Sequence, residues 1–151
     1  MRVIFSDPYP PSAEEARALG ADPRPTIEDV LREADFVSLH CPATPETRHL
    51  INAERLSQMK RDAYLINTAR GDVVDEAALV AALQAGVIKG AGLDVFEKEP
   101  VVTEALLGME NVVLLPHLGS ATLDTREAMG LRAIENLKLF FAGQPVRDRV
   151  V

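Results

Sequence analysis

The chain has 151 residues, of which 47% are hydrophobic and 26% charged, and 16 basic against 23 acidic side chains give a formal net charge of −7. This length permits a hydrophobic core that needs no metal or disulfide for stability, and the single cysteine excludes an intramolecular disulfide. The acidic balance argues against a nucleic-acid or anionic-membrane surface, and the longest apolar run, residues 77–83, is too short to span a bilayer.

Short β-branched and aliphatic runs alternate with stretches of helical spacing, which is the pattern of βα units in a parallel α/β fold. We expect a strand at residues 3–5, a helix at 13–19 that Gly20 ends, and then a very short second strand. Thr26 is expected to cap the next helix, whose apolar residues fall on one face. The first third of the chain therefore predicts two βα units.

The same alternation continues to the C-terminal region. Further strands are expected at residues 36–40, 63–67, 89–96 and 112–115. Helices are expected at 53–59, from the cap Asp75 to about residue 85, and from Thr122 onward. The last helix carries an apolar stripe that we interpret as a packing surface, made of Leu131, Ile134, Leu137 and Phe141. No repeat, low-complexity tract or linker divides the chain, so we expect one unit.

In an open parallel sheet ligands bind outside the carboxyl ends of the strands, so polar residues just after each strand are the site candidates. Asp7 ends the first strand. Its carboxylate can bind the 2′-hydroxyl of an adenosine ribose and repel a 2′-phosphate, or it can simply start a turn before Pro8. The first reading favours NAD over NADP.

Arg70 follows another strand in the sequence Asn67-Thr68-Ala69-Arg70-Gly71, where Gly71 is expected to permit a tight reversal. A guanidinium there can bind a carboxylate through two parallel hydrogen bonds, although a surface ion pair is an equally simple role. The run from Gly92 to Pro100 carries three carboxylates, a cluster that surface solvation can explain. His117 follows the last strand and is either a general acid or base or a structural residue.

Weaker patterns are rejected. Gly90-Ala91-Gly92 lies inside a predicted strand and lacks a third glycine, so it is not a phosphate-binding turn. Cys41 has no second cysteine with which to form a zinc or redox site, and His40 and His49 have no visible partners. Packing or surface roles are expected for both histidines.

Together these motifs resemble the D-isomer-specific 2-hydroxyacid dehydrogenases. Three motifs carry the resemblance, and they occur in the family's order: Asn67-Thr68-Ala69-Arg70-Gly71 with Val74-Asp75-Glu76, Gly92-Leu93-Asp94-Val95-Phe96 with Glu99-Pro100, and Pro116-His117-Leu118-Gly119-Ser120-Ala121-Thr122. Two shorter stretches also match the family, His40-Cys41-Pro42 and Pro45-Glu46-Thr47-Arg48. It extends over nearly the whole chain. Within the family, the order Gly119-Ser120-Ala121-Thr122 and the stretch His49-Leu50-Ile51-Asn52 are more similar to glyoxylate/hydroxypyruvate reductases than to phosphoglycerate dehydrogenases.

The resemblance implies an NAD-dependent oxidoreductase that reduces a small 2-keto acid to a D-2-hydroxy acid. It implies that Arg70 binds the substrate, that His117 supplies the proton and that Glu99 orients His117. The implied NAD-binding residues are Asp7, Cys41, Pro42, Thr47, Thr68, Ala69, Arg70, Asp94, His117, Gly119 and Ser120. A homodimer and a cytoplasmic location are also implied, the latter in agreement with the single cysteine and the acidic charge. The alternative is a non-catalytic, truncated or nucleotide-sensing regulatory module of the same fold.

A Rossmann unit binds pyrophosphate on a glycine-rich turn about 20 residues before the ribose-binding acid, which here would be Asp7. We therefore expect residues 1–151 to be the distal part of a Rossmann-like domain without its first strand and glycine-rich turn, with the helix from 122 packing toward a missing substrate domain. The absence of a central strand predicts exposed strand edges, poor autonomous folding and self-association.

Overall fold

The computed structural model describes residues 1–150, and its internal contacts divide the chain into two compact units. The first is Met1–Pro116, and the second comprises the described residues from His117 onward. The sequence contains no linker signal at this boundary, and the expectation of one unit did not anticipate the division. Each unit is described by itself.

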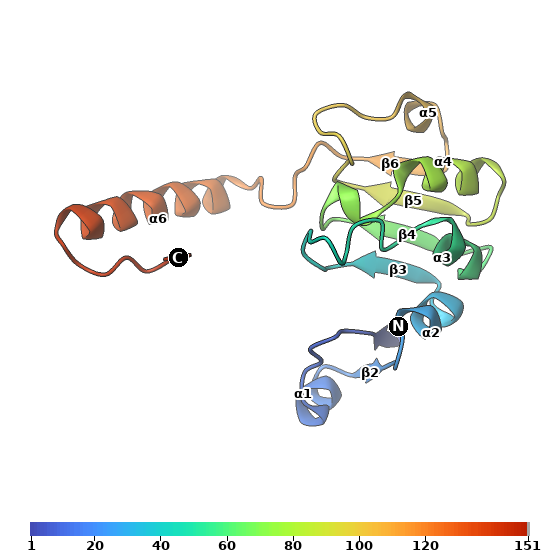
Figure 1. The fold of residues 1–151 in the computed structure, drawn as a ribbon, viewed down its shortest axis with the longest axis horizontal. Coiled ribbons are helices and arrows are strands. Elements are labelled where there is room, and N and C mark those ends of the chain that lie inside the picture. The colour runs from blue at the N-terminus through green and yellow to red at the C-terminus, as the bar shows by residue number, and fades with distance from the viewer. Residues whose placement is uncertain (151) are drawn as a thin grey trace. The chain divides into compact units, whose positions relative to one another are not determined.

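All strands of the first unit are parallel, which confirms the predicted α/β class. β1 (Val3–Phe5) and β2 (Ala21–Pro23) form a two-stranded sheet. The strands β3 (Phe36–Leu39), β4 (Tyr64–Asn67), β5 (Gly90–Leu93) and β6 (Val112–Leu114) form a separate sheet in that order (Figure 1). No strand among residues 1–150 pairs with both β1 and β3. Within the described chain, the two sheets are therefore not joined by a shared strand.

Most helices of this unit begin at a side chain that accepts a backbone N–H, which explains where they start. The helices are α1 (Ala13–Ala18), α2 (Ile27–Glu33), α3 (Ala53–Gln58) and α4 (Glu76–Gln84), with the caps Ser12, Thr26, Asn52 and Asp75. Thr26 and Asp75 confirm predicted caps. Gly20 follows α1 and Gly86 follows α4, each with φ of 64°, a value that glycine adopts without strain.

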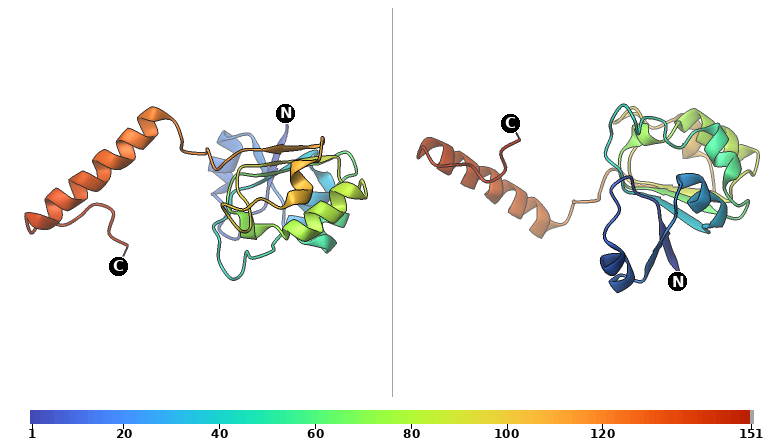
Figure 2. Two further views of the ribbon diagram at one scale, coloured as in Figure 1. Left: turned by 90° about the horizontal axis from the view of Figure 1, so that it is seen from above. Right: turned by 60° about the horizontal axis from the view of Figure 1, so that its bottom comes forward.

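One face of the four-stranded sheet is buried and the other is open in the described residues. Burial alternates along β3, where Val37 and Leu39 are buried while Phe36 and Ser38 are exposed. Helices α3 and α4 lie along the buried face (Figure 2), and Leu56 and Leu79 pack from them into the core. Parallel sheets are ordinarily covered on both faces. The exposed rings and aliphatic side chains of the second face are thus an uncovered apolar surface.

Three parts of the first unit differ from the expected elements. β5 ends at Leu93 rather than at residue 96, because Asp94 N still bonds to Asn67 O at 2.9 Å but Phe96 N turns to the Glu99 carboxylate. The short helix α5 (Glu104–Leu107) and the 3-10 helix η1 (Gly71–Val73) were not predicted. Both are single turns, which are too short to show a helical period.

The second unit contains α6 (Leu123–Phe141), which the predicted cap Thr122 begins. The apolar stripe expected to pack is exposed: the fractional exposure is 66% for Leu131, 56% for Leu137 and 82% for Phe141. None of the described helices is both long and apolar enough to cross a membrane.

Candidate active site

The register of the sheet brings the expected site loops to one edge. Leu39 lies opposite Asn67, Asn67 opposite Leu93, and Leu93 opposite Leu114. The segments after β3, β4, β5 and β6 therefore leave the sheet at the same level, as ligand-binding loops of parallel sheets do.

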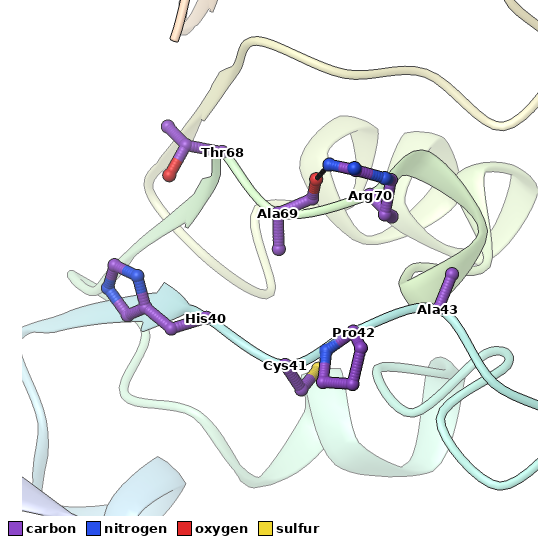
Figure 3. A pocket seen from close by; sticks show the side chains of 7 residues that line it. All are labelled: His40, Cys41, Pro42, Ala43, Thr68, Ala69 and Arg70. Atoms are coloured by element: carbon purple, nitrogen blue, oxygen red, sulfur yellow. Dashed lines mark hydrogen bonds between the residues drawn. The ribbon is translucent and has the colours of Figure 1, made fainter. Parts of the chain in front are cut away.

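An open pocket of about 560 Å³ lies between the segments that follow β3 and β4 (Figure 3). Its walls are His40, Cys41, Pro42, Ala43, Thr68, Ala69 and Arg70. Five of these seven are residues that the sequence assigned to nucleotide binding. The lining combines small apolar side chains with an imidazole, a hydroxyl and a guanidinium, and small-molecule sites typically mix apolar and polar groups in this way.

The loop that carries Arg70 is held by Asn67, which is only 1% exposed. Asn67 Nδ2 donates to Arg70 O at 2.9 Å, and Asn67 Oδ1 accepts from Ala69 N at 3.1 Å. Arg70 itself is exposed, and its Nη1 donates to Ala69 O at 2.7 Å. The sequence interpretation treated Asn67 only as the end of a strand. An asparagine directly before a loop of small residues was the signal that could have revealed this role.

Cys41 lies on the wall opposite the Arg70 loop, and Thr47 holds the turn that follows it. Burial raises the pKa of the Cys41 thiol, and the nearby charge of Asp72 raises it further, so the group is a protonated thiol near neutral pH. Thr47 was assigned to nucleotide binding. Its hydroxyl donates to Pro42 O at 2.6 Å and accepts from Thr44 N at 2.8 Å, which closes the turn after the pocket.

Gly71 has a different role from the expected one. It does not have a positive φ, so the tight-reversal argument was wrong. A Cβ at this position would overlap the carbonyl group of Phe96 and lie 2.5 Å from Glu97 N. The Arg70 loop therefore packs, backbone against backbone, on the segment that leads to Glu99.

The three carboxylates after β5 differ in burial, so surface solvation does not explain all of them. Asp94 is 4% exposed, and Glu97 Oε1 lies 3.0 Å from His49 Nε2. His49 thus has a charged partner, which the sequence did not show. Glu99 is exposed, and its Oε1 accepts a hydrogen bond from Phe96 N at 3.0 Å.

Asp7 lies after β1, outside the four-stranded sheet. Its Oδ1 accepts from Tyr9 N at 2.7 Å, as the turn interpretation predicts. The ribose-binding role stays a prediction.

His117, Gly119 and Ser120 belong to the second unit. His117 has φ of 55°, in the left-handed region where non-glycine residues are uncommon, and Ala121 N donates to Leu118 O at 2.9 Å in the same loop. The structure therefore brings the Arg70 pocket and the Glu99 segment together, while the grouping of His117 with them stays a prediction.

Comparisons with known proteins agree with this geometry. The family model described as "D-isomer specific 2-hydroxyacid dehydrogenase, NAD binding domain" matches residues 1–119. The glyoxylate reductase of Pyrococcus horikoshii is 55% identical over 146 residues, which cover 95% of this chain and 42% of that protein.

Two solved structures share the fold. The holo form of D-mandelate dehydrogenase from Rhodotorula graminis has a TM-score of 0.90 at 36% identity, covering 97% of this chain and 43% of that one. The NADPH-dependent glyoxylate/hydroxypyruvate reductase from Sinorhizobium meliloti has a TM-score of 0.88 at 42% identity, covering 98% and 45%. The chain thus spans less than half the length of these relatives.

Proposed function

The chain belongs to the D-isomer-specific 2-hydroxyacid dehydrogenases, and from this premise we infer that it supplies the NAD-binding part of an enzyme that reduces glyoxylate or hydroxypyruvate to the D-2-hydroxy acid. The observation that carries the proposal is the Arg70 loop. Asn67 fixes it at the rim of a pocket lined by five expected nucleotide-binding residues. A guanidinium held there suits a small substrate that presents a carboxylate beside a carbonyl.

In this proposal Arg70 binds the substrate carboxylate and carbonyl oxygen through paired hydrogen bonds. A dinucleotide held by Cys41, Pro42, Thr68 and Ala69 of the pocket would supply the hydride for the carbonyl carbon. His117 donates a proton to the carbonyl oxygen, so that the 2-keto acid becomes the 2-hydroxy acid, and Glu99 orients the imidazole. Proton donor and guanidinium together neutralise the charge that develops on the oxygen.

We propose NAD as the preferred nucleotide because the Asp7 carboxylate, placed after β1, would repel a 2′-phosphate. The Sinorhizobium meliloti relative is NADPH-dependent, so the choice needs a measurement. Fluorescence titration with NADH and NADPH measures which nucleotide binds more tightly. Tighter binding of NADPH would refute the proposal that Asp7 selects NAD.

The activity is best tested in a chimaera in which residues 1–151 replace the matching part of the Pyrococcus horikoshii glyoxylate reductase. We expect NADH-dependent reduction of glyoxylate. Arg70→Ala removes charged hydrogen bonds of about 1.5–3 kcal/mol each, so kcat/KM should fall about 100-fold or more, and His117→Ala should lower kcat about 10²–10⁴-fold. Arg61→Ala, at another exposed arginine, is the matched control.

Normal turnover after His117→Ala would refute the proton-donor role. A wild-type chimaera that binds NADH without turnover would instead favour the non-catalytic, nucleotide-sensing alternative. The homodimer and the cytoplasmic location are part of the same proposal, and sedimentation of the chimaera and fractionation of cells test them separately.

A further inference from the structure

A buried carboxylate outside the pocket holds both ends of the segment that carries Glu99. Glu76, the first residue of α4, is 7% exposed. Its Oε2 accepts from Glu97 N at 3.0 Å, and its Oε1 accepts a hydrogen bond from the Thr103 hydroxyl. A carboxylate removed from water is stable only when such donors replace its hydration. Both oxygens of Glu76 are therefore committed to residues 97 and 103.

The segment between these two anchors is a closed turn. Val101 N donates to Lys98 O at 2.9 Å, and Phe96 N donates to Glu99 Oε1 at 3.0 Å. Glu99 thus lies inside a loop whose own hydrogen bonds fix its shape, while Glu76 fixes where that loop sits on the rest of the unit.

Neighbouring contacts reinforce the anchor at residue 97. Glu97 Oε2 accepts from Glu76 N at 3.5 Å, and Glu97 Oε1 lies 3.0 Å from His49 Nε2 and 3.8 Å from Arg48 Nη2. The backbone of Gly71 packs on Phe96 from the other side. The Glu99 segment is consequently held at two places, by Gly71 of the Arg70 loop and by Glu76 in the first turn of α4.

Glu76 does not serve simply as the cap of α4. Asp75 Oδ1 accepts from Ala78 N at 3.0 Å and fills that role. A carboxylate in a first helical turn also interacts favourably with the helix dipole, but that effect does not require contact with residues 97 and 103.

We propose that Glu76 is a positioning residue for Glu99: through Glu97 and Thr103 it sets where the Glu99 carboxylate stands relative to the Arg70 loop. The proposal rests on the proposed function, in which Glu99 orients the proton donor. Glu76 itself touches neither substrate nor nucleotide in this scheme, so its effect on catalysis is entirely one of geometry.

Amide exchange of the ¹⁵N-labelled 151-residue chain tests the contact without any assay of activity. Glu76→Ala should speed exchange of the Phe96 and Glu97 amides about tenfold or more relative to the amides of Ala91 and Asp94, which bond to Asn111 O and Asn67 O. Glu76→Gln should retain protection, because its Oε1 can accept from Glu97 N and its Nε2 can donate to Thr103. Asp75→Ala is the matched control, since it weakens α4 and leaves both Glu76 contacts in place. An equal rise at all four amides, or none at the first two, would overturn the proposal.

The chimaera gives the catalytic readout. Glu76→Ala should lower kcat about 10- to 100-fold with KM little changed and should displace the pH–rate profile, while Glu76→Gln should restore most of the rate. An unchanged kcat and pH profile in Glu76→Ala would refute the positioning role. If the unmutated chimaera is inactive, the proposed function fails, and amide exchange still decides whether Glu76 holds the segment.

Discussion

At the scale of the residue, the buried polar side chains of the described chain all lie in or beside the loops of the candidate site. They are Asn67, Glu76 and Asp94, and each lies in or directly beside one of the two loops that carry Arg70 and Glu99. Buried polar groups are stable only when hydrogen-bonded, and they specify one arrangement of the backbone they bind. Arg70 and Glu99, which we propose to act in catalysis, are exposed, and these buried neighbours hold the backbone of the loops that carry them.

Asn67→Ala tests this dependence. The substitution leaves Arg70 O and Ala69 N without their side-chain partner, so we expect a loss of about 1–3 kcal/mol in the free energy of unfolding. Urea denaturation measures it. Asn111→Ala is the control, because the exposed Asn111 donates only one bond of 3.2 Å to Lys89 O, and its cost should be within about 0.5 kcal/mol. Equal costs for both variants would contradict the argument.

The sequence revealed those site residues whose chemistry is local. Asp75 as a cap and Arg70 as an exposed loop cation follow from neighbours within a few positions. The roles of Gly71 and His49 depend on a segment more than twenty residues away, because Gly71 packs on Phe96 and Glu97 and His49 contacts Glu97. A single sequence does not indicate which distant segment of backbone will pack against a given residue.

At the scale of the element, most helix starts and strand positions were predicted, including the end of β4 at Asn67, but the end of β5 was not. The strand at β5 was expected to reach residue 96 because the apolar run continues, and it ends at Leu93. Val95 and Phe96 are buried beyond the sheet, where they extend the core beneath the turn. A run of hydrophobic residues indicates that a segment is buried. Whether the buried segment is a strand or a turn depends on its backbone hydrogen bonds, which the run does not indicate.

Gly71→Ala tests the contact between the two site loops. The added methyl group would overlap the Phe96 carbonyl, so the Arg70 loop or the Glu99 segment must move, at a cost of about 1–3 kcal/mol. Gly108→Ala offers a matched control, since no atom lies within 4 Å of its Cβ position, and we expect a change within about 0.5 kcal/mol. Thermal unfolding of the two variants compares them, and an unperturbed Gly71→Ala would show that the loops do not constrain each other.

At the scale of the whole molecule, the described first unit presents open edges and one uncovered sheet face. Within residues 1–150, β1 pairs only with β2 and β3 only with β4, and Phe36 is 62% exposed on the uncovered face. Unpaired edges and apolar faces promote association between chains. The exposed strand edges were predicted from the sequence, whereas the uncovered face of the sheet was found only in the structure.

Ser38→Lys should reduce self-association of the chain. A lysine on an exposed position of an edge strand opposes pairing with a strand of another chain. The protein concentration at which half of the chains are associated should therefore rise about tenfold, equivalent to ~1.4 kcal/mol. Ser57→Lys adds the same charge on an exposed position of α3 and should have little effect. Sedimentation equilibrium compares the variants with the wild type, and identical midpoints would show that the β3 edge is not the contact.

The shared register of Leu39, Asn67, Leu93 and Leu114 also constrains how related sequences can change in length. One residue inserted within β4 would turn every later side chain of the strand to the opposite face, and would send Asn67 out of the core. The same insertion between α4 and β5, near Gly86, would alter only a turn remote from the carboxyl edge. Gaps tolerated among homologous chains should therefore collect at the end of the sheet away from Arg70, leaving the strand lengths themselves invariant.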